Sequence, residues 1–309
     1  MSHGSTKIAS KGVCIYCRRS GIKLTDEHIV PFFIGGSHIL TQASCLECNK
    51  ITSKFELEVA RNLWGDARIA ANAPSRRKKN RKSSILLHDP DDRSITREIP
   101  YDEYPAIFVF YFMQKAGLLQ GLPETIDLSK QWQLKTISNT AKTKAFEEKY
   151  PGKLTAQLKH VPDSFARLIA KIGYGQALTL LDIGEFKPLC LPYILGKKKN
   201  LSFIVGSDDG NSDPKKGIGY SLNTGGFGTP ERIMIVSTVR LLADNPTPNY
   251  HIVVGEVIGR DKVTRAIEKL SPDGLEMLPF DAVPSGLYRP QNHWSPSVWP
   301  LPYLPKEYV

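Results

Sequence analysis

The sequence predicts an α+β fold in which a small cysteine-rich unit precedes a larger mixed region. Three observations support this prediction. Two Cys-x-x-Cys pairs lie within residues 13–64, the patterns of that unit follow the order strand, strand, helix, and strand-like and helix-like stretches occur together beyond residue 95 without an internal repeat. The 309 residues, 41% hydrophobic and 23% charged, leave room for one large globular domain or two of ordinary size.

The cysteine-rich unit contains two predicted strands and a helix. Residues 24–31 are the first strand, which ends at Pro31 because proline cannot continue a sheet ladder. Gly35-Gly36 predicts a turn, and residues 39–44 are the second strand. From residue 49 the pattern is helical, with a narrow apolar face made of residues four apart: Ile51, Phe55, Val59 and Leu63.

The predicted organisation has three parts. They are a module over residues 1–64, a basic connector over 65–94, and an α+β domain of unassigned role over 95–309. The connector holds six cations in the seven residues 76–82, followed by turn-forming residues at 89–92.

The C-terminal region contains one clear helix and several strands. Helical spacing joins Phe165, Leu168, Ile169, Ile172, Gln176 and Leu180. An apolar run covers residues 107–113, and strands rich in Ile and Val are predicted at residues 201–205, 233–242 and 250–257. Turns are predicted at 206–219 and at the glycine-rich residues 225–228, and a proline-rich extended tail over the last thirty residues. No nucleotide-cofactor motif is present, because the glycine-rich residues lack the strand-to-helix context of a phosphate-binding loop.

Four of the five cysteines form two Cys-x-x-Cys pairs, Cys14 with Cys17 and Cys45 with Cys48. Such pairs, without an export signal, point to metal binding before disulfides. Each pair turns two thiolates toward one point, so together they predict a tetrahedral structural zinc site with no open coordination position. The alternative is two unrelated pairs of small buried residues. Cys190, between two leucines, is predicted to be a buried apolar residue.

The positive charge is concentrated near the N-terminus. The formal charge of the chain is +10. Residues 1–82 hold fifteen Lys or Arg against six Asp or Glu, a balance of +9, so the other 227 residues contribute about +1. Zinc-bound thiolates lower the local balance by about two units. A basic segment beside a nearly neutral body predicts an anionic partner, with nucleic acid ahead of a membrane surface.

No apolar run approaches the roughly 20 residues that span a bilayer. Residues 1–12 also lack the apolar core of a secretory signal peptide. A cytoplasmic protein without a membrane partner is therefore expected.

The motifs of the cysteine-rich unit resemble those of the HNH endonucleases. The resemblance rests on the two cysteine pairs, on Thr25-Asp26-Glu27-His28-Ile29-Val30-Pro31, on Gly35-Gly36, and on Ala43-Ser44-Cys45-x-x-Cys48-Asn49. It covers about residues 13–64 and implies a ββα-metal fold of the subgroup with a four-cysteine zinc site. More loosely, residues 165–189 resemble stand-alone bacterial HNH proteins.

The resemblance implies roles for three residues. His28 stands where the family keeps its general base, which takes a proton from water so that hydroxide attacks phosphorus. Glu27 stands where the family usually has Asp as a ligand of a catalytic Mg²⁺ or Mn²⁺. Asn49 stands at the last letter of the motif and would be the second protein ligand of that cation. The alternatives are a structural role for His28 and a helix N-cap for Asn49.

Two features of this motif depart from a simple pattern. Neighbouring side chains on a strand point to opposite faces, so Glu27 and His28 can face one ion only if the strand is twisted or bulged. The family commonly has an Asn shortly before the second cysteine pair, where it holds the backbone that orients the histidine. Gln42 is the nearest counterpart here, and His38 is a rival on the same stretch.

Several cations are candidate phosphate contacts, which give affinity but little sequence choice. They are Arg18, Arg19, Lys50, Lys54, Arg61, Arg68 and the run at 76–82. Lys54 and Arg61, seven residues apart on the motif helix, are favoured, whereas the run is as compatible with a solvated linker.

The function that the resemblance implies is hydrolysis of phosphodiester bonds in DNA, by an endonuclease with a divalent cation beside a structural zinc. Defence against foreign DNA is expected by analogy alone. Two alternatives stay open: a zinc-stabilised nucleic-acid-binding protein without catalysis, and an RNA-directed nuclease. The sequence predicts neither the target nor the oligomeric state.

Overall fold

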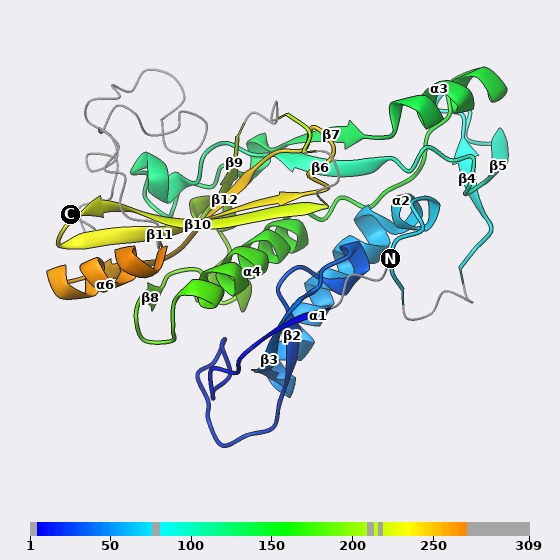
Figure 1. Cartoon of the computed structure of the whole chain (residues 1–309). Helices are drawn as coiled ribbons and strands as arrows, with labels where there is room; N and C mark the ends of the chain where they lie inside the picture. The colour runs from blue at the N-terminus through cyan, green and yellow to red at the C-terminus, as the bar shows by residue number, and fades with distance from the viewer. Residues whose placement is uncertain (1–4, 76–80, 209–212, 216–218, 271–309) are drawn as a thin grey trace.

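The computed structural model describes residues 5–75, 81–208, 213–215 and 219–270 (Figure 1). The proline-rich tail predicted over the last thirty residues lies outside these ranges, as do most of the basic run at 76–82 and part of the turn-rich segment at 206–219. Mixed α and β structure, with the cysteine-rich unit at its N-terminal end, confirms the predicted fold class.

The N-terminal part has the predicted order of strand, strand and helix. Its elements are β1 (Thr6–Ile8), β2 (Leu24–His28), the 3-10 turn η1 (Phe32–Ile34), β3 (His38–Cys45), α1 (Leu46–Glu58), the π-helical turn η2 (Val59–Leu63) and α2 (Gly65–Ala70). β2 and β3 form an antiparallel hairpin, and β1 adds to β3 in parallel, so the sheet order is β1-β3-β2. The first strand ends at His28, three residues before the predicted end at Pro31.

The apolar face of the motif helix differs from the predicted one. Phe55, Val59 and Leu63 are buried, but Ile51 is 36% exposed and Thr52 takes the buried position instead. A spacing of four residues exceeds the 3.6 residues of an α-helical turn, so a longer row drifts off one face. The π-helical turn, in which Trp64 N donates to Val59 O at 3.0 Å, is wider than an α-helical turn. Val59 and Leu63, four residues apart, are therefore both on the buried face.

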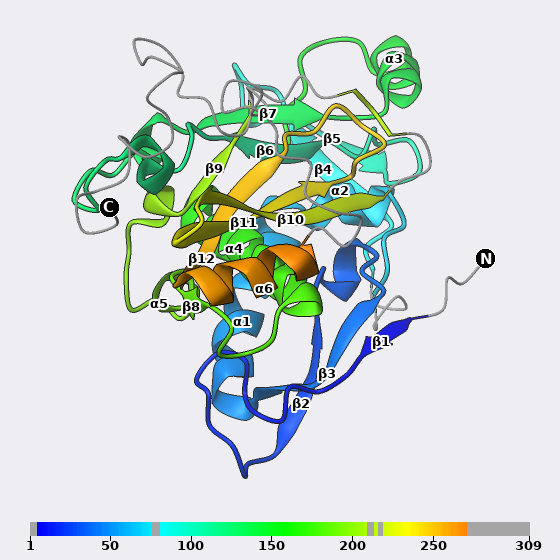
Figure 2. The same ribbon diagram turned by 60° about the vertical axis from the view of Figure 1, so that its left-hand side comes forward.

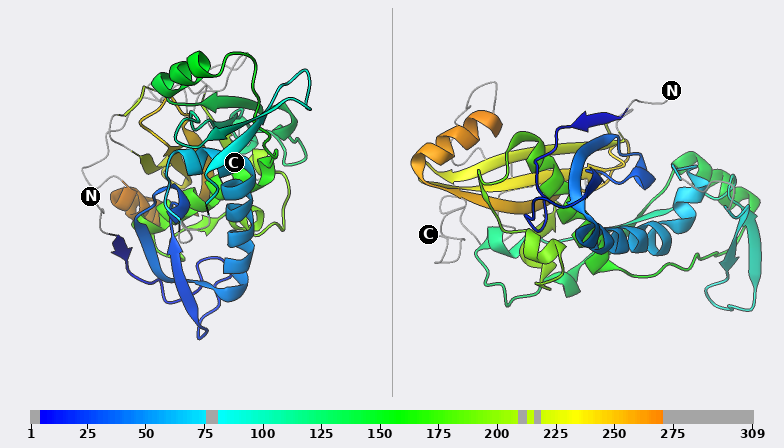
Figure 3. Two further views of the ribbon diagram at one scale, coloured as in Figure 1. Left: turned by 90° about the vertical axis from the view of Figure 1, so that its right-hand side faces the viewer. Right: turned by 90° about the horizontal axis from the view of Figure 1, so that it is seen from below.

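The predicted connector over residues 65–94 contains regular structure. α2 lies in it, and so does β4 (Ser84–His88), which pairs antiparallel with β5 (Thr96–Pro100). A small second core forms around Ile85, Leu87 and Ile99, and Phe146 of α3 (Thr140–Lys149) packs against it. This β4–β5 arm projects at the end of the molecule opposite α6 (Figure 3).

The C-terminal region is built around a five-stranded sheet. Its further elements are β6 (Phe108–Phe112), η4 (Gly117–Gln120), η5 (Ser129–Gln131), β7 (Gln133–Ile137), α4 (Pro162–Leu180), β8 (Lys187–Pro188), α5 (Leu191–Ile194), η6 (Leu201–Phe203), β9 (Val205–Ser207), β10 (Tyr220–Thr229), β11 (Arg232–Leu241), β12 (Tyr250–Ile258) and α6 (Arg260–Leu270). The sheet order is β10-β11-β12-β8, β9 also pairs with β12, and β6 and β7 form a separate antiparallel pair. The predicted helix and the strands at 233–242 and 250–257 are confirmed as α4, β11 and β12.

Two local predictions in this region are wrong. The strand predicted at 201–205 is the 3-10 turn η6 followed by the short strand β9. The glycine-rich residues 225–228, predicted as a turn, lie inside β10. A Cβ at Gly226 would lie 3.0 Å from Ile233 Cδ1 and 3.5 Å from Leu270 Cδ1, so glycine here leaves room for α6 on the sheet rather than for a turn.

Helix α4 lies between the N-terminal module and the large sheet (Figures 1 and 2). On one side a Cβ at Gly173 would lie 2.9 Å from Ile252 Cδ1 of β12, so only glycine permits this approach of the helix to the sheet. On the other side Gly175 faces Ile29, and a Cβ at this glycine would lie 3.4 Å from Ile29 Cγ2. The helix therefore contacts both parts of the chain closely.

One hydrophobic core runs through both parts. It extends from Cys14 to Ala266, and Cys190 is fully buried in it as predicted. Trp64 illustrates the continuity, since its ring lies 5.3 Å from Phe110 and 5.7 Å from Phe165. The division at residues 64 and 94 stays a prediction, but the core crosses both positions. Within the described residues, no helix has the length and apolar character needed to cross a bilayer.

The shared core predicts that the chain unfolds as one unit. Trp64 is buried and its Nε1 donates to Val109 O at 2.7 Å. Trp64→Ala should lower the free energy of unfolding by about 3–5 kcal/mol, and Trp64→Phe by roughly 1–3 kcal/mol because the Val109 carbonyl loses its donor. Urea unfolding followed by circular dichroism measures both, and two separate transitions of which Trp64→Ala moves only one would contradict the shared core.

Candidate functional site

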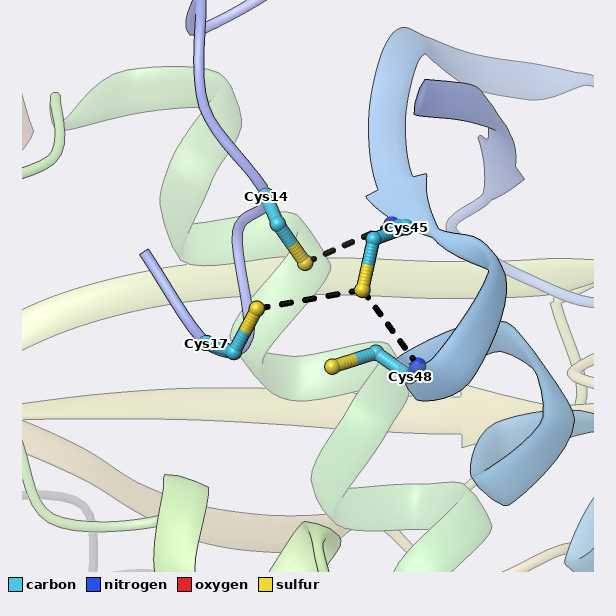
Figure 4. Close-up of side chains that lie close together, drawn as sticks. All are labelled: Cys14, Cys17, Cys45 and Cys48. Carbon is cyan, nitrogen blue, oxygen red and sulfur yellow. Dashed lines mark hydrogen bonds between the residues drawn. The ribbon is translucent and has the colours of Figure 1, made fainter. Parts of the chain in front are cut away.

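The four paired cysteines converge on one point (Figure 4). Cys14 and Cys17 come from the turn before β2, Cys45 ends β3 and Cys48 lies in the first turn of α1. Their sulfur atoms all lie within 4.8 Å of one another, and the Cys17 and Cys45 sulfurs are 3.8 Å apart. Tetrahedral zinc with Zn–S bonds of about 2.3 Å requires sulfur separations of about 3.8 Å. The cluster therefore suits a structural zinc ion.

Backbone amides also point at these sulfurs. Cys45 N donates to Cys14 Sγ at 3.4 Å, and Cys48 N donates to Cys45 Sγ at 3.5 Å. The second contact makes Cys45 the N-cap of α1. Asn49 is therefore not the N-cap, and the capping alternative for this residue is wrong.

The thiols need more positive charge than the protein itself provides. Burial raises the pKa of Cys14 and of Cys48. Burial acts in the same direction at Cys17, but hydrogen bonds from Arg19 outweigh it and lower the pKa of Cys17 to about 6. Arg19 donates from Nε to Cys17 and from Nη2 to Cys45, at 3.4 and 3.5 Å. A dication at the cluster would supply the remaining charge that thiolate ligands require.

His28 is the last residue of β2 and is half-buried. Its strand is held in register because His28 pairs with Ile39 and the following amide, Ile29 N, donates to His38 O at 3.0 Å. The imidazole ring lies 6.0 Å from the ring of Phe32, which is 42% exposed in the loop after the strand. His28 is therefore a partly accessible histidine at a strand end.

Glu27 is turned into the protein. Only 6% of its side chain is exposed, and Oε1 forms an ion pair with Lys171 Nζ of α4 at 2.6 Å. The pairing of β2 with β3 shifts between Thr25 and Glu27, but Glu27 and His28 themselves pair in regular register with Leu40 and Ile39, so this shift does not turn the two side chains to one face. Oε2 is buried and has no hydrogen-bond partner among the described residues. That oxygen remains able to accept a further donor or a cation.

Lys171 joins three parts of the site. Its ammonium lies 2.6 Å from Glu27 Oε1, 2.5 Å from Glu56 Oε1 on α1 and 2.7 Å from the carbonyl oxygen of His28. Burial disfavours the ammonium, but the carboxylates of Glu27 and Glu56 outweigh this effect and raise the pKa of Lys171. The lysine is therefore charged in the folded protein.

Asn49 lies in the first turns of α1 and is half-buried. Its side-chain oxygen accepts a hydrogen bond from Ser53 Oγ at 3.2 Å. Within the described residues, no hydrogen bond joins Asn49 to Glu27. The two predicted cation ligands thus occupy neighbouring elements, α1 and β2, and their shared role stays a prediction.

The two candidates for the middle motif residue lie in different environments. Gln42 is exposed, has a positive φ of 45°, and its backbone amide donates to Asp26 Oδ1 at 3.0 Å. His38 lies beside the strand of His28, and its Nδ1 is 2.9 Å from Tyr220 Oη of β10. Of the two, His38 is the residue with a backbone hydrogen bond next to His28, because its carbonyl oxygen accepts from Ile29 N.

The candidate phosphate contacts divide into two groups. Lys50, Lys54 and Arg61 are exposed along α1 and η2. Arg68 is bound to the carbonyl oxygens of three residues, and burial lowers its pKa to about 10, so its role is structural. Arg19 is likewise engaged at the cysteine cluster.

Lys171 is the functional residue that the sequence analysis missed. The sequence did contain a sign of it. Between Phe165 and Leu180, where an apolar helix is predicted, Arg167 and Lys171 are the two charged residues. A lysine on the buried face of a helix needs a specific partner. Its partners lie more than a hundred residues away in sequence, so the pattern alone does not identify them.

Comparison with known proteins agrees with this arrangement. Residues 14–63 match the model of the HNH endonuclease family, and the matched segment begins at the first cysteine and includes the cluster, His28 and Asn49. No curated protein and no solved structure matches the chain.

The cysteine cluster predicts the zinc content of two variants. Cys48→Ala should reduce bound zinc from one ion per chain to well below one, and should lower the free energy of unfolding by several kcal/mol because metal binding contributes to folding. Cys190→Ala is the matched control, since it removes a buried thiol outside the cluster and should keep the zinc. Metal analysis and thermal unfolding measure both, and equal zinc in the two variants would contradict the assignment.

Proposed function

Because the chain carries an HNH endonuclease domain over residues 14–63, we propose that it is a metal-dependent endonuclease that hydrolyses phosphodiester bonds in DNA. The observation that supports the proposal is the position of His28 within the family match. Its half-buried imidazole stands at the end of β2, where the backbone pairs with β3 and accepts a hydrogen bond from Lys171. A module that only bound nucleic acid would not need a histidine there.

His28 acts as the general base in this proposal. Its imidazole takes a proton from a water molecule, and the resulting hydroxide attacks the phosphorus atom. A new P–O bond forms while the bond to the leaving sugar oxygen breaks. The hydrogen bond from Lys171 to the His28 carbonyl fixes the backbone from which the ring extends.

Glu27 and Asn49 would hold the divalent cation. Support comes from Glu27 Oε2, a buried carboxylate oxygen without a hydrogen-bond partner among the described residues, since carboxylate and amide oxygens are ligands that Mg²⁺ and Mn²⁺ accept. When bound, the cation stabilises the charge on the leaving oxygen. Glu27 keeps its other oxygen on Lys171, so its carboxylate is oriented before any cation binds.

The outer side of the motif helix would contact the DNA backbone. Lys50, Lys54 and Arg61 are exposed there, and positions seven residues apart lie on nearly the same side of a helix. Such cations neutralise phosphates without choosing a sequence. They place the backbone near the domain and leave the choice of target to other parts of the chain.

The proposal predicts the effect of removing the base. His28→Ala should cleave plasmid DNA about 10²- to 10⁴-fold more slowly with Mg²⁺ or Mn²⁺, because general-base catalysis contributes a factor of that order. Nicking assays on the zinc-loaded protein measure the rate, and a gel-shift assay confirms that the variant still binds DNA. His88→Ala, which alters a histidine on the β4–β5 arm, is the matched control and should cleave normally.

Three other results would each redirect the proposal. Cleavage by His28→Ala at the wild-type rate would place the base elsewhere. Salt-dependent binding without cleavage by any form would favour a non-catalytic nucleic-acid-binding protein. Preferential cleavage of RNA, when both nucleic acids compete in one assay, would make the enzyme an RNA-directed nuclease.

The phosphate contacts predict a change in salt dependence. The double variant Lys54→Ala, Arg61→Ala should lower the slope of log binding constant against log salt concentration by about two units, since each lost phosphate contact removes roughly 0.9. Lys130→Ala, which removes an exposed cation of the C-terminal region, should leave the slope unchanged. Fluorescence anisotropy at several salt concentrations measures both, and equal slopes would remove this helix from the interface.

A further inference from the structure

The lysine ammonium on α4 is fully occupied by oxygen atoms of the HNH domain. Lys171 is 2% exposed, and its ammonium donates hydrogen bonds to a Glu56 carboxylate oxygen and to the His28 carbonyl and forms an ion pair with a Glu27 carboxylate oxygen. Two of these oxygens belong to β2 and one to α1. Lys171 follows His28 by 143 residues, so this contact comes from the C-terminal region.

Stability alone does not account for a buried lysine at this position. Replacing a buried ion pair by apolar residues of similar volume is often neutral or stabilising, because desolvation offsets the attraction. The surroundings on α4 are apolar, with Leu168, Ile172 and Leu178 fully buried, so a methionine would pack in the same row. The lysine provides instead two directed hydrogen bonds and an ion pair, which set the position of β2 relative to α1.

Other contacts from the C-terminal region hold β3 and the cysteine-bearing turn before β2. Tyr174, one turn further along α4, donates to Ile15 O at 2.7 Å. Tyr220 of β10 lies 2.9 Å from His38 Nδ1, on the strand that pairs with β2. Both strands beside the loop after His28 are therefore held by elements that lie beyond residue 95.

We propose that Lys171 is a positioning residue for His28, and that the C-terminal region is in this way part of the nuclease scaffold. The inference rests on the proposed function, because His28 is the base only if the protein is a nuclease. Gln42, which the sequence suggested for holding the histidine backbone, is exposed and its side chain makes no hydrogen bond among the described residues. Lys171 makes the contact to the His28 carbonyl directly.

The proposal predicts a defect in turnover rather than in DNA binding. Lys171→Met should lower kcat about 10- to 100-fold, as losses of supporting hydrogen bonds in catalytic sites do. KM should change less than about threefold, because a side chain that is 2% exposed cannot touch DNA. Lys171→Arg keeps the charge and the donors, so it should recover part of the lost kcat.

A second variant separates positioning from folding. Lys171→Met leaves the buried Glu27 carboxylate beside the half-buried Glu56 without a counter-ion, which can unfold the domain. The double variant Lys171→Met, Glu56→Met removes one carboxylate and keeps the volume. Arg232→Met is the matched control, since it removes an ion pair to the buried Glu256 in the large sheet. Zinc content and melting temperature establish that each form is folded.

The outcomes decide the proposal separately from the nuclease function. A folded, zinc-loaded double variant with low kcat, unchanged KM and partial recovery by Lys171→Arg supports it. Wild-type kcat in the double variant overturns it, because Lys171 would then only neutralise Glu56. If no form cleaves nucleic acid, the proposed function fails, and hydrogen exchange of residues 24–31 still tests the contact. Faster exchange there in the double variant, but not in Arg232→Met, supports the positioning; equal exchange overturns it.

Discussion

A buried lysine ammonium joins the two halves of this protein, and the arrangement of the site depends on it. Lys171 is surrounded by oxygen atoms of Glu27, Glu56 and His28, and a cation in such a place is tolerated only while those oxygens are in position. The requirement is reciprocal, since the two carboxylates also need the lysine. Helix α4, strand β2 and helix α1 are therefore placed relative to one another by a single charged cluster.

The cysteine cluster and Lys171 contact opposite ends of the hairpin formed by β2 and β3. Near the cysteines, Cys45 pairs with Leu24 at the start of β2, whereas Lys171 binds at His28, where β2 ends. A hairpin of this size is only marginally stable by itself in water. The cysteine cluster at one end, which suits a zinc ion, and burial against α4 at the other give it a defined position.

Local features of the site could be predicted from the sequence, but distant ones could not. The spacing of Cys14, Cys17, Cys45 and Cys48 predicts the cluster, because ligand geometry follows from short turns. The order of strands and helix in the module and the position of α4 follow from apolar periodicity. The burial of Glu27 depends on Lys171, which is 144 positions away, and no local pattern contains that pairing. Ile51 was misplaced because a spacing of four residues drifts off one face of a helix with 3.6 residues per turn.

We infer that the strand of His28 unfolds in the same cooperative unit as the large sheet, because one hydrophobic core contains residues of both. Native-state hydrogen exchange of the wild-type protein in increasing urea tests this most directly. With one shared core, Ile29 N, bonded to His38 O, and Val253 N, bonded to Ile204 O, should exchange through one opening with the same free energy and the same dependence on urea. Exchange of Ile29 through a separate opening of lower free energy, while Val253 stays protected, would contradict it.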